Sequence, residues 1–174
     1  MRDIFLWRVQ SYLCAMSYRI GSGIDFHQLT EGRGLWIGGV LLPHYKGALG
    51  HSDADALLHA ICDSLLGALA LGDIGMHFPD NDPAYRDMDS KVLLSRVVDL
   101  VKKEGYKVVN VDSTVTLEMP KIKPYVNQMR EIIAQILEIS TREVSIKATT
   151  TEKMGYVGRE EGIVAYATAL LTKK

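Results

Sequence analysis

The chain has 174 residues, of which 47% are hydrophobic and 24% are charged. This length and composition are typical of one globular domain with a hydrophobic core. The formal net charge is −1, and the basic residues are scattered along the chain. The sequence therefore gives no electrostatic reason to expect binding to nucleic acid or to an anionic membrane surface.

Residues 1–17 differ from the rest of the chain. Their apolar beginning is interrupted by Arg8, Gln10 and Ser11, so it is too short and too polar to span a bilayer. We interpret residues 1–17 as an N-terminal extension of uncertain role and residues 18–174 as a single domain. The two cysteines cannot form a disulfide framework, and we expect Cys62 to be a reduced core residue.

The first predicted element is a strand over residues 18–26. Its residues alternate between two faces: Ile20, Ser22, Ile24 and Phe26 on one, and Gly21, Gly23 and Asp25 on the other. Gly21 and Gly23 lie on one face, where they would allow a ligand or another backbone to approach closely. A turn over 30–34 then leads to a second short strand over 35–37.

A helix is predicted next. Ser52 followed by Asp55 resembles a capping box, and the apolar pattern after it continues to about Leu69. Asp55, His59 and Asp63 are spaced four residues apart, so they are expected to form a polar ridge beside the apolar stripe of the helix.

The rest of the chain alternates between helical and strand patterns. The mixture of both kinds of element predicts an α+β fold, a mixed β-sheet with helices on one face. The remaining elements expected are a long loop over 72–89, a helix over 90–104, a strand over 107–118, a helix over 124–138 and strands over 143–150 and 162–171. Alternation in the strand over 107–118 places one set of residues on its apolar face: Val109, Val111, Ser113, Val115 and Leu117.

One carboxylate and two imidazoles form a candidate metal site. Asp25 and His27 are two residues apart on a strand, so they project from the same face, and His59 lies in the following helix. Such a three-ligand set suits Zn²⁺ and leaves a fourth coordination position open. Asp55 and Asp63 are candidates to accept the other ring N–H of His59. Because a lone histidine is more often a packed or surface residue, metal binding and a structural role both stay open on residue chemistry alone.

Two further stretches suit phosphate. His51 and Ser52 lie at the predicted helix N-terminus, which favours an anion, although N-capping by Ser52 alone would also explain them. Residues 147–153 place three threonines between two lysines, which are donors that phosphate oxygens bind. An edge strand that runs into a turn would account for this stretch equally well.

Taken together, six blocks closely resemble the 2-C-methyl-D-erythritol 2,4-cyclodiphosphate synthase family, the cyclising enzymes of the non-mevalonate isoprenoid pathway. The resemblance extends from about Tyr18 to the C-terminus, in order and without large gaps. Several multi-residue blocks in sequence are far more specific than any one of them. The blocks are Ile-Gly-Ser-Gly-Ile-Asp-Phe-His (20–27), Ile-Gly-Gly-Val (37–40), His-Ser-Asp-Ala-Asp (51–55), Leu-Gly-Asp-Ile-Gly (71–75), Phe-Pro-Asp-Asn-Asp-Pro (78–83) and Lys-Ala-Thr-Thr-Thr-Glu-Lys (147–153).

The resemblance implies a lyase that converts 4-diphosphocytidyl-2-C-methyl-D-erythritol 2-phosphate to 2-C-methyl-D-erythritol 2,4-cyclodiphosphate. The reaction is a metal-assisted intramolecular phosphoryl transfer that releases CMP. The implied assembly is a homotrimer with active sites at the subunit interfaces, acting on a small cytidine diphosphate substrate, with no nucleic-acid or membrane partner. The implied location is the bacterial cytoplasm, with a plastid as the alternative.

The resemblance also implies residue roles. Asp25, His27 and His59 would hold Zn²⁺ or another divalent cation, whose fourth ligand is a β-phosphate oxygen. Mg²⁺ or Mn²⁺ would bridge the substrate's α- and β-phosphates near Glu152. His51 and Thr150 match the positions assigned to transition-state stabilisation. The implied substrate-binding residues are Ser52, Asp73, Gly75, Phe78, Asp80, Asp82, Leu117, Pro120, Lys121, Thr149, Thr151, Glu152, Tyr156 and Arg159.

Two alternatives belong to other functional classes. A non-catalytic trimer that binds an isoprenoid or nucleotide diphosphate would keep the fold but lack a metal or transition-state residue, and none is missing here. A zinc hydrolase acting on a nucleotide would need a group that activates water, and Asp55 and Asp63 are the nearby candidates.

Overall fold

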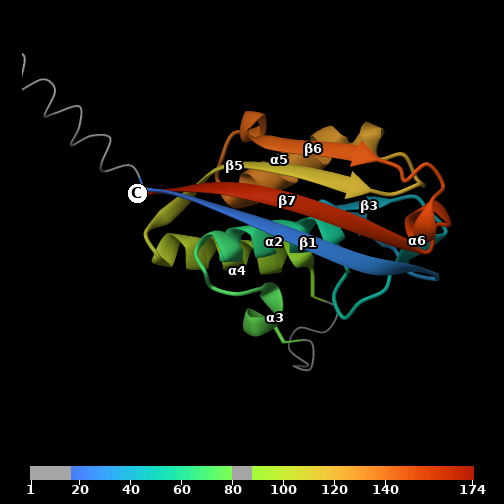
Figure 1. Cartoon of the computed structure of the whole chain (residues 1–174), viewed down its shortest axis with the longest axis horizontal. Coiled ribbons are helices and arrows are strands. Elements are labelled where there is room, and N and C mark those ends of the chain that lie inside the picture. Colours follow the sequence, from blue (N-terminus) through green and yellow to red (C-terminus); the bar gives the residue numbers. More distant parts are fainter. Residues whose placement is uncertain (1–16, 80–87) are drawn as a thin grey trace, which may run out of the picture.

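The computed structural model describes residues 17–79 and 88–174, and its centre is a five-stranded mixed sheet (Figure 1). All neighbouring strands are antiparallel except the last pair, β5 and β6, which are parallel. In sheet order the strands are β4 (Lys46–Ala48), β1 (Tyr18–Glu31), β7 (Gly162–Lys173), β5 (Tyr106–Thr116) and β6 (Val144–Thr149). A separate hairpin pairs β2 (Leu35–Ile37) with β3 (Val40–Leu42).

In the described part of the chain, three long helices cover one face of this sheet, and two short helices lie in the connections (Figure 1). Residues on the covered face of β7 are fully or almost fully buried, from Ile163 through the alternating alanines to Leu171. The predicted α+β architecture, a mixed sheet with helices, is therefore confirmed. The helices are α2 (Ala56–Ala68), α3 (Ile74–His77), α4 (Ser90–Lys103), α5 (Val126–Leu137) and α6 (Gly155–Gly158), with 3₁₀ turns at Lys123–Tyr125 and Thr141–Glu143.

Two glycines let α2 lie directly against β1. A Cβ atom at Gly21 would be 2.1 Å from the backbone oxygen of Ser64, and one at Gly23 would be 2.1 Å from that of Ala60. Only a residue without a side chain fits such an approach. The close contact predicted from these glycines is confirmed, and the approaching group is the backbone of α2. This contact brings the helix that carries His59 onto the strand that carries Asp25.

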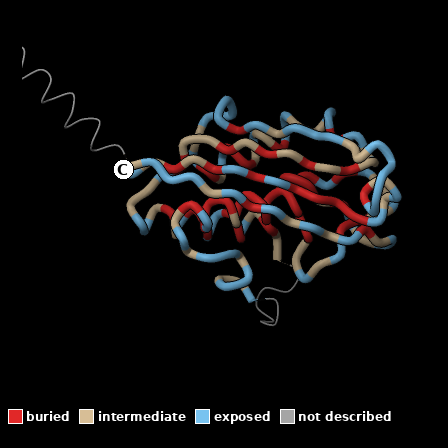
Figure 2. Tube along the Cα trace, viewed as in Figure 1, coloured by how far each residue is buried: buried red, intermediate tan, exposed pale blue. Residues whose placement is uncertain are grey.

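The other face of the sheet exposes a group of large apolar side chains. Ile20 is 71% exposed, Ile24 50%, Phe26 57% and Tyr166 44%. Ile24 and Tyr166 are directly paired across β1 and β7, so the group is continuous from strand to strand. Figure 2 shows that exposed and buried segments alternate along the central strands of the sheet. A contiguous exposed apolar surface of this kind is typical of a protein–protein interface.

Several predicted boundaries were wrong. The first strand continues to Glu31, and α2 begins at Ala56 with Asp55 as its N-cap, so the predicted capping box of Ser52 with Asp55 does not form. The predicted loop over 72–89 contains the short helix α3, which is capped by Asp73. These features depend on contacts between distant residues, which local periodicity does not record.

The strand pattern also shifted within β5. A β-bulge between Val108 and Asn110 changes the register against β7. Val108 is therefore buried, and Val109, which the alternation placed on the apolar face, is only half-buried. Beyond the bulge the predicted alternation is confirmed, with Val111, Ser113 and Val115 buried.

Two expectations from composition can be compared with the structure. Cys62 is a free cysteine with a fully buried side chain, as predicted. Cys14 and most of the predicted extension lie outside the described residues. Among residues 17–79 and 88–174, no helix is both long enough and apolar enough to cross a membrane.

Candidate active site

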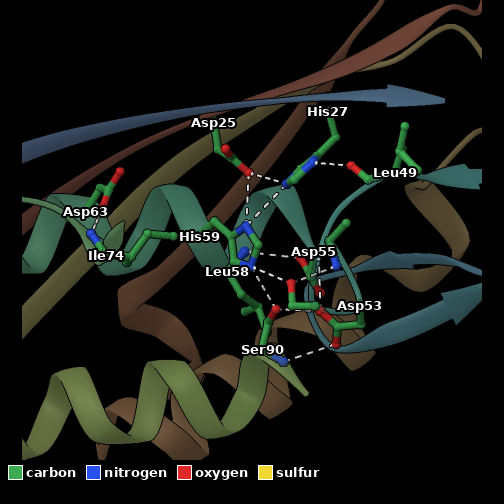
Figure 3. Close-up of polar contacts among 12 residues, drawn as sticks. Asp25, His27, Leu49, Asp53, Asp55, Leu58, His59, Asp63, Ile74 and Ser90 are labelled. Carbon is green, nitrogen blue, oxygen red and sulfur yellow. Dashed lines mark hydrogen bonds and ion pairs between the residues drawn. The ribbon is translucent and has the colours of Figure 1, made fainter. Parts of the chain in front are cut away.

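The three predicted metal ligands converge on one point between β1 and α2 (Figure 3). The Oδ2 atom of Asp25 lies 2.9 Å from Nε2 of His27 and 3.2 Å from Nδ1 of His59. The two ring nitrogens are themselves 3.3 Å apart. Three lone-pair donors directed at one another are the arrangement that a single cation can satisfy.

Each imidazole has its second nitrogen held by another group. The Nδ1 atom of His27 is 2.8 Å from the backbone oxygen of Leu49, and Nε2 of His59 is 2.8 Å from Oγ of Ser90. A carbonyl oxygen accepts only, so His27 donates its Nδ1–H and leaves Nε2 available as a ligand. Outer contacts of this kind set the tautomer of metal-binding histidines. The residues present therefore fit a Zn²⁺ ion, with protein ligands at three of its four positions.

Asp55 and Asp63 do not support His59, contrary to the sequence-based prediction. The Asp55 carboxylate accepts hydrogen bonds from the backbone N–H groups of Gly38, Gly39 and Leu58 at 2.9, 2.6 and 3.1 Å. Asp63 accepts one from the backbone N–H of Ile74 at 2.8 Å. Both side chains are turned to backbone donors, and each therefore anchors a neighbouring segment instead of His59. Helical spacing placed them beside His59 but did not determine their partners.

The electrostatics of the cluster favour a charged carboxylate. Burial acts to raise the pKa of Asp25, but the contacts with the His27 and His59 imidazoles outweigh it and hold this pKa well below its usual range. Burial acts to lower the pKa of His27, but the hydrogen bond and charge of Asp25 raise it overall. Without a metal, the protein therefore stabilises a proton on His27 in the place where a cation would bind.

A cavity of about 410 Å³ opens in front of this cluster. His51 and Ser52 line it from the segment before α2, and Gly75 and Phe78 line it from α3 and its C-terminal end. Asp73 caps α3 and accepts a hydrogen bond from the N–H of Met76 at 3.0 Å. The carboxylate of Asp55 accepts the N–H of Leu58 at the N-terminus of α2, so Asp55 and not Ser52 caps this helix.

A second group of predicted residues lies on the β5 and β6 side of the sheet. A cavity of about 280 Å³ is lined there by predicted residues from the segment after β5 and from the end of β6: Leu117, Pro120, Lys121, Thr149 and Thr150. The hydroxyl of Thr150 donates to Glu152 at 2.7 Å. This cavity combines apolar residues, such as Val115 and Ile122, with the polar side chains of Lys121 and the two threonines, a combination that suits a nucleotide.

Glu118, which the sequence analysis did not single out, holds the turn that follows Thr150. Its Oε1 atom accepts hydrogen bonds from the backbone N–H groups of Thr151 and Lys153, at 3.0 and 3.1 Å, and from the Thr151 hydroxyl at 3.2 Å. Glu152 and Lys153 both have positive φ, at 52° and 64°. The carboxylate therefore stabilises a conformation that these residues adopt only at a cost.

The remaining predicted residues fall in three places. Tyr156 is in α6 and packs against Gly162, and Arg159 forms a two-bond ion pair with Glu161 at 2.8 and 2.9 Å. Asp80 and Asp82 lie outside the described residues. Within one chain the metal cluster and the Thr150 cavity share no lining residue, because β7 and β5 separate β1 from β6.

Comparison with known sequences identifies relatives along almost the whole chain. The sequence pattern of the YgbB family matches residues 18–172. A 2-C-methyl-D-erythritol 2,4-cyclodiphosphate synthase from Chloroherpeton thalassium is 62% identical over 155 residues, which is 89% of this chain and 99% of the relative. The enzyme of the same name from Porphyromonas gingivalis strain W83 is 56% identical over 154 residues, 88% of this chain and 95% of the relative.

Solved structures agree with the sequence comparison. The bifunctional IspDF from Campylobacter jejuni superposes with a TM-score of 0.88 at 36% identity, over 91% of this chain and 43% of that longer protein. The CDP complex of IspF from Plasmodium falciparum gives a TM-score of 0.80 at 35% identity, over 91% of this chain and 97% of that chain. Both the fold and the sequence therefore lead to one conclusion: this chain belongs to the YgbB family, whose curated relatives are 2-C-methyl-D-erythritol 2,4-cyclodiphosphate synthases.

Proposed function

We propose that the Asp25–His27–His59 cluster is the zinc site at which this chain performs the reaction of its family. The chain is a lyase of the non-mevalonate isoprenoid pathway, in which 4-diphosphocytidyl-2-C-methyl-D-erythritol 2-phosphate is cyclised and CMP is released. One observation carries the assignment of the site. Three ligand atoms lie within 3.3 Å of one another, and the second nitrogen of each imidazole is held by another group.

The reaction requires positioning and charge neutralisation more than acid–base chemistry. The substrate's 2-phosphate forms a bond to the β-phosphorus, and the bond from that phosphorus to the oxygen leaving with CMP breaks. Because the attacking group is already an anion, the protein needs no strong general base. When bound, a zinc ion would polarise a β-phosphate oxygen and orient the phosphorus for attack. The open cavity in front of His27 and His59 gives the diphosphate access to that position.

The other residues are proposed to hold the substrate on either side of the reacting phosphorus. His51 and Thr150 would donate hydrogen bonds where negative charge develops. Glu152 is proposed to help hold Mg²⁺ or Mn²⁺, which would neutralise negative charge on the substrate's diphosphate. The methylerythritol part is assigned to residues around α3, Ser52, Asp73, Gly75, Phe78, Asp80 and Asp82. The cytidine diphosphate part is assigned to Leu117, Pro120, Lys121, Thr149, Thr151, Tyr156 and Arg159.

A homotrimer with shared active sites would unite the two groups of residues. β1 and β6 are three strand spacings apart, roughly 14 Å, whereas two-metal phosphate sites hold their ions about 3.5–4 Å apart. Within one chain this separation keeps the metal cluster away from the Thr150 cavity. A shared site would therefore combine the metal cluster of one chain with the Thr150 cavity of a neighbouring chain. The exposed apolar face around Ile24, Phe26 and Tyr166 supplies a surface that such an assembly would bury.

Two further assignments extend the proposal to the whole chain. Residues 18–174 are proposed as the catalytic domain and residues 1–17 as an extension outside it, because the family pattern begins at residue 18. A location in the bacterial cytoplasm is proposed because the relatives from Chloroherpeton thalassium and Porphyromonas gingivalis are bacterial enzymes. The alternative of a non-catalytic trimer is not favoured, since the relatives are named as enzymes and the metal cluster is assembled.

The direct test is to incubate the protein with the cytidyl substrate and to identify both products. CMP and the cyclic diphosphate are expected in equal amounts. Free phosphate or a linear diphosphate would instead indicate the hydrolase class. An unchanged substrate in the presence of zinc and magnesium would favour a binding protein.

Shared sites are tested by hybrid assembly. His59→Ala and Thr150→Ala chains are each expected to be inactive alone, because each spoils a different half of every site. Hybrids co-expressed with two affinity tags should recover part of the activity, since some interfaces combine two intact halves. Verified hybrids that stay inactive would count against an active site built from two chains.

A further inference from the structure

We propose that Ser90, held in place by Asp53, is a positioning residue that presents Nδ1 of His59 to the metal. This inference rests on the zinc site proposed above and assigns the outer support of one of its ligands. Ser90 opens α4, and Asp53 lies just before α2, so the proposal links two helices to the metal centre. Neither residue is among the metal ligands or the residues assigned to substrate.

The hydrogen bonds around Ser90 determine where its hydroxyl proton points (Figure 3). Ser90 is fully buried, and its Oγ–H donates to Oδ1 of Asp53 in a short hydrogen bond. The backbone N–H of Ser90 donates to the other carboxylate oxygen of Asp53 at 3.1 Å. Since a hydroxyl has one proton, Oγ faces His59 as an acceptor only.

This arrangement selects one tautomer of His59. The Nε2 atom of His59 lies 2.8 Å from Oγ of Ser90, so it must carry the ring proton to make that hydrogen bond. Nδ1 is then unprotonated, and it faces Asp25 and His27 at 3.2 and 3.3 Å. The other tautomer would direct its lone pair at Ser90 and a proton at the cation.

Ser52 is a weaker candidate for the same task. Its Oγ lies 3.3 Å from Nε2 of His59, 0.5 Å farther away than Oγ of Ser90, and it also accepts the backbone N–H of Ala54 at 3.0 Å. Ser52 lines the open cavity, whereas Ser90 is fully buried. The buried Ser90 hydroxyl, which the half-buried Asp53 carboxylate holds in place, therefore provides the more constrained support.

The first experiment compares two fully buried serines. Ser90→Ala removes the acceptor from His59, whereas Ser64→Ala removes a hydroxyl that only donates to the backbone oxygen of Ile61 within α2. Zinc affinity is measured by competition with a chromophoric chelator. Loss of an outer-shell partner typically lowers metal affinity about 10- to 100-fold, and this range is expected for Ser90→Ala. Ser64→Ala should bind zinc as the wild-type protein does.

A second variant tests whether Asp53 acts through Ser90. In Asp53→Asn no orientation of the amide can accept both the hydroxyl and the backbone N–H of Ser90, so zinc affinity should fall here as well. The double variant with Ser90→Ala should lose less affinity than the product of the two single losses, because both changes disrupt one path. Multiplicative losses would show that Asp53 acts independently of Ser90.

Nitrogen NMR of the wild-type protein, stripped of metal, provides a readout that requires no variant. The spectrum should show His59 protonated at Nε2 and unprotonated at Nδ1. A proton at Nδ1, or wild-type zinc affinity in a folded Ser90→Ala protein, would overturn the inference. Zinc affinity that is unchanged in the His59→Ala variant would instead refute the zinc site itself, so the two failures are distinguishable.

Discussion

The Nε2 atom of His27 and the Nδ1 atom of His59 lie 3.3 Å apart, although 32 positions separate the two residues in the sequence. Their proximity follows from the absence of side chains at Gly21 and Gly23, which allows α2 to lie on β1. Packing of these two elements therefore creates the candidate metal centre.

His59→Ala should fold and assemble but lose zinc. The chain has a large hydrophobic core that does not require a metal for stability, whereas two remaining ligands bind zinc poorly. Because a catalytic metal contributes several kcal/mol of charge stabilisation, turnover should fall by roughly 10³-fold or more. His44→Ala, outside the cluster, is the control and should change neither zinc content nor turnover. A zinc-free His59→Ala protein with full activity would move the reaction elsewhere.

The stability of the metal-free protein should depend on pH through Asp25 and His27. The pKa of Asp25 is lowered from 3.8, so its contribution is present above that pH and is lost as the pH falls through the folded-state pKa. The pKa of His27 is raised from 6.5, so its contribution is complete below that pH and is lost as the pH rises through the folded-state pKa. Both contributions are present together between these two values.

Thermal unfolding in excess chelator checks this window. The difference in Tm between the wild-type protein and Asp25→Asn should be largest between about pH 4 and pH 6.5 and should shrink at higher pH. His77→Gln, whose ring lies outside the metal cluster and faces the backbone oxygen of Leu71, serves as a histidine control. A difference that grows steadily toward alkaline pH would contradict the assigned ion pair.

Asp55→Asn should destabilise the fold although it is nearly isosteric. The buried carboxylate accepts N–H groups from Gly38 and Gly39 through separate oxygens, and an amide would place its NH₂ against one of these donors. An unsatisfied buried donor costs about 1–3 kcal/mol in the free energy of unfolding. Asp89→Asn is the matched control, because Asp89 is an N-cap whose side chain is 45% exposed and asparagine caps helices equally well. Urea unfolding of both variants measures the difference.

Glu118→Ala should weaken substrate binding more than it affects the fold. Its carboxylate holds the turn that contains Glu152, and hydrogen bonds from the N–H groups of Lys153 and Thr151 lower its pKa, so it is charged at neutral pH. Loss of this support would let the turn leave its positive-φ conformation. The KM for the cytidyl substrate and for magnesium should rise, with little change in Tm, whereas Glu131→Ala on the exposed side of α5 should alter neither. An unchanged KM would show that the turn holds its shape without Glu118.

Removal of residues 1–15 should leave activity and assembly intact. The family pattern begins at residue 18, and the curated relatives match about nine-tenths of this chain. Size-exclusion chromatography with light scattering and the product assay provide the comparison. A tenfold or greater loss of turnover, or a smaller assembly, would assign these residues a role in the working enzyme.

Local sequence patterns were sufficient to predict most of the long elements and to group Asp25, His27 and His59 as candidate metal ligands. Alternation along a strand and the spacing of apolar residues along a helix depend on neighbours only a few positions away. Asp25 and His27 had to share a face because they are two residues apart on a strand. The blocks that resemble the cyclodiphosphate synthases added the reaction, which periodicity alone does not specify.

Contacts between distant residues were decided only by the tertiary structure. Ser90 lies 31 positions from His59 and supports it, while Asp55 and Asp63, which share its helix, turn to backbone donors. Two other features also depend on contacts between distant residues: the β-bulge at Val108, and the hydrogen bond by which Glu118 holds the turn at Thr151. A side chain's partner depends on which elements pack beside it, and packing is a property of the whole fold. Residue chemistry thus determined what could bind at this site, and packing determined which groups hold it in position.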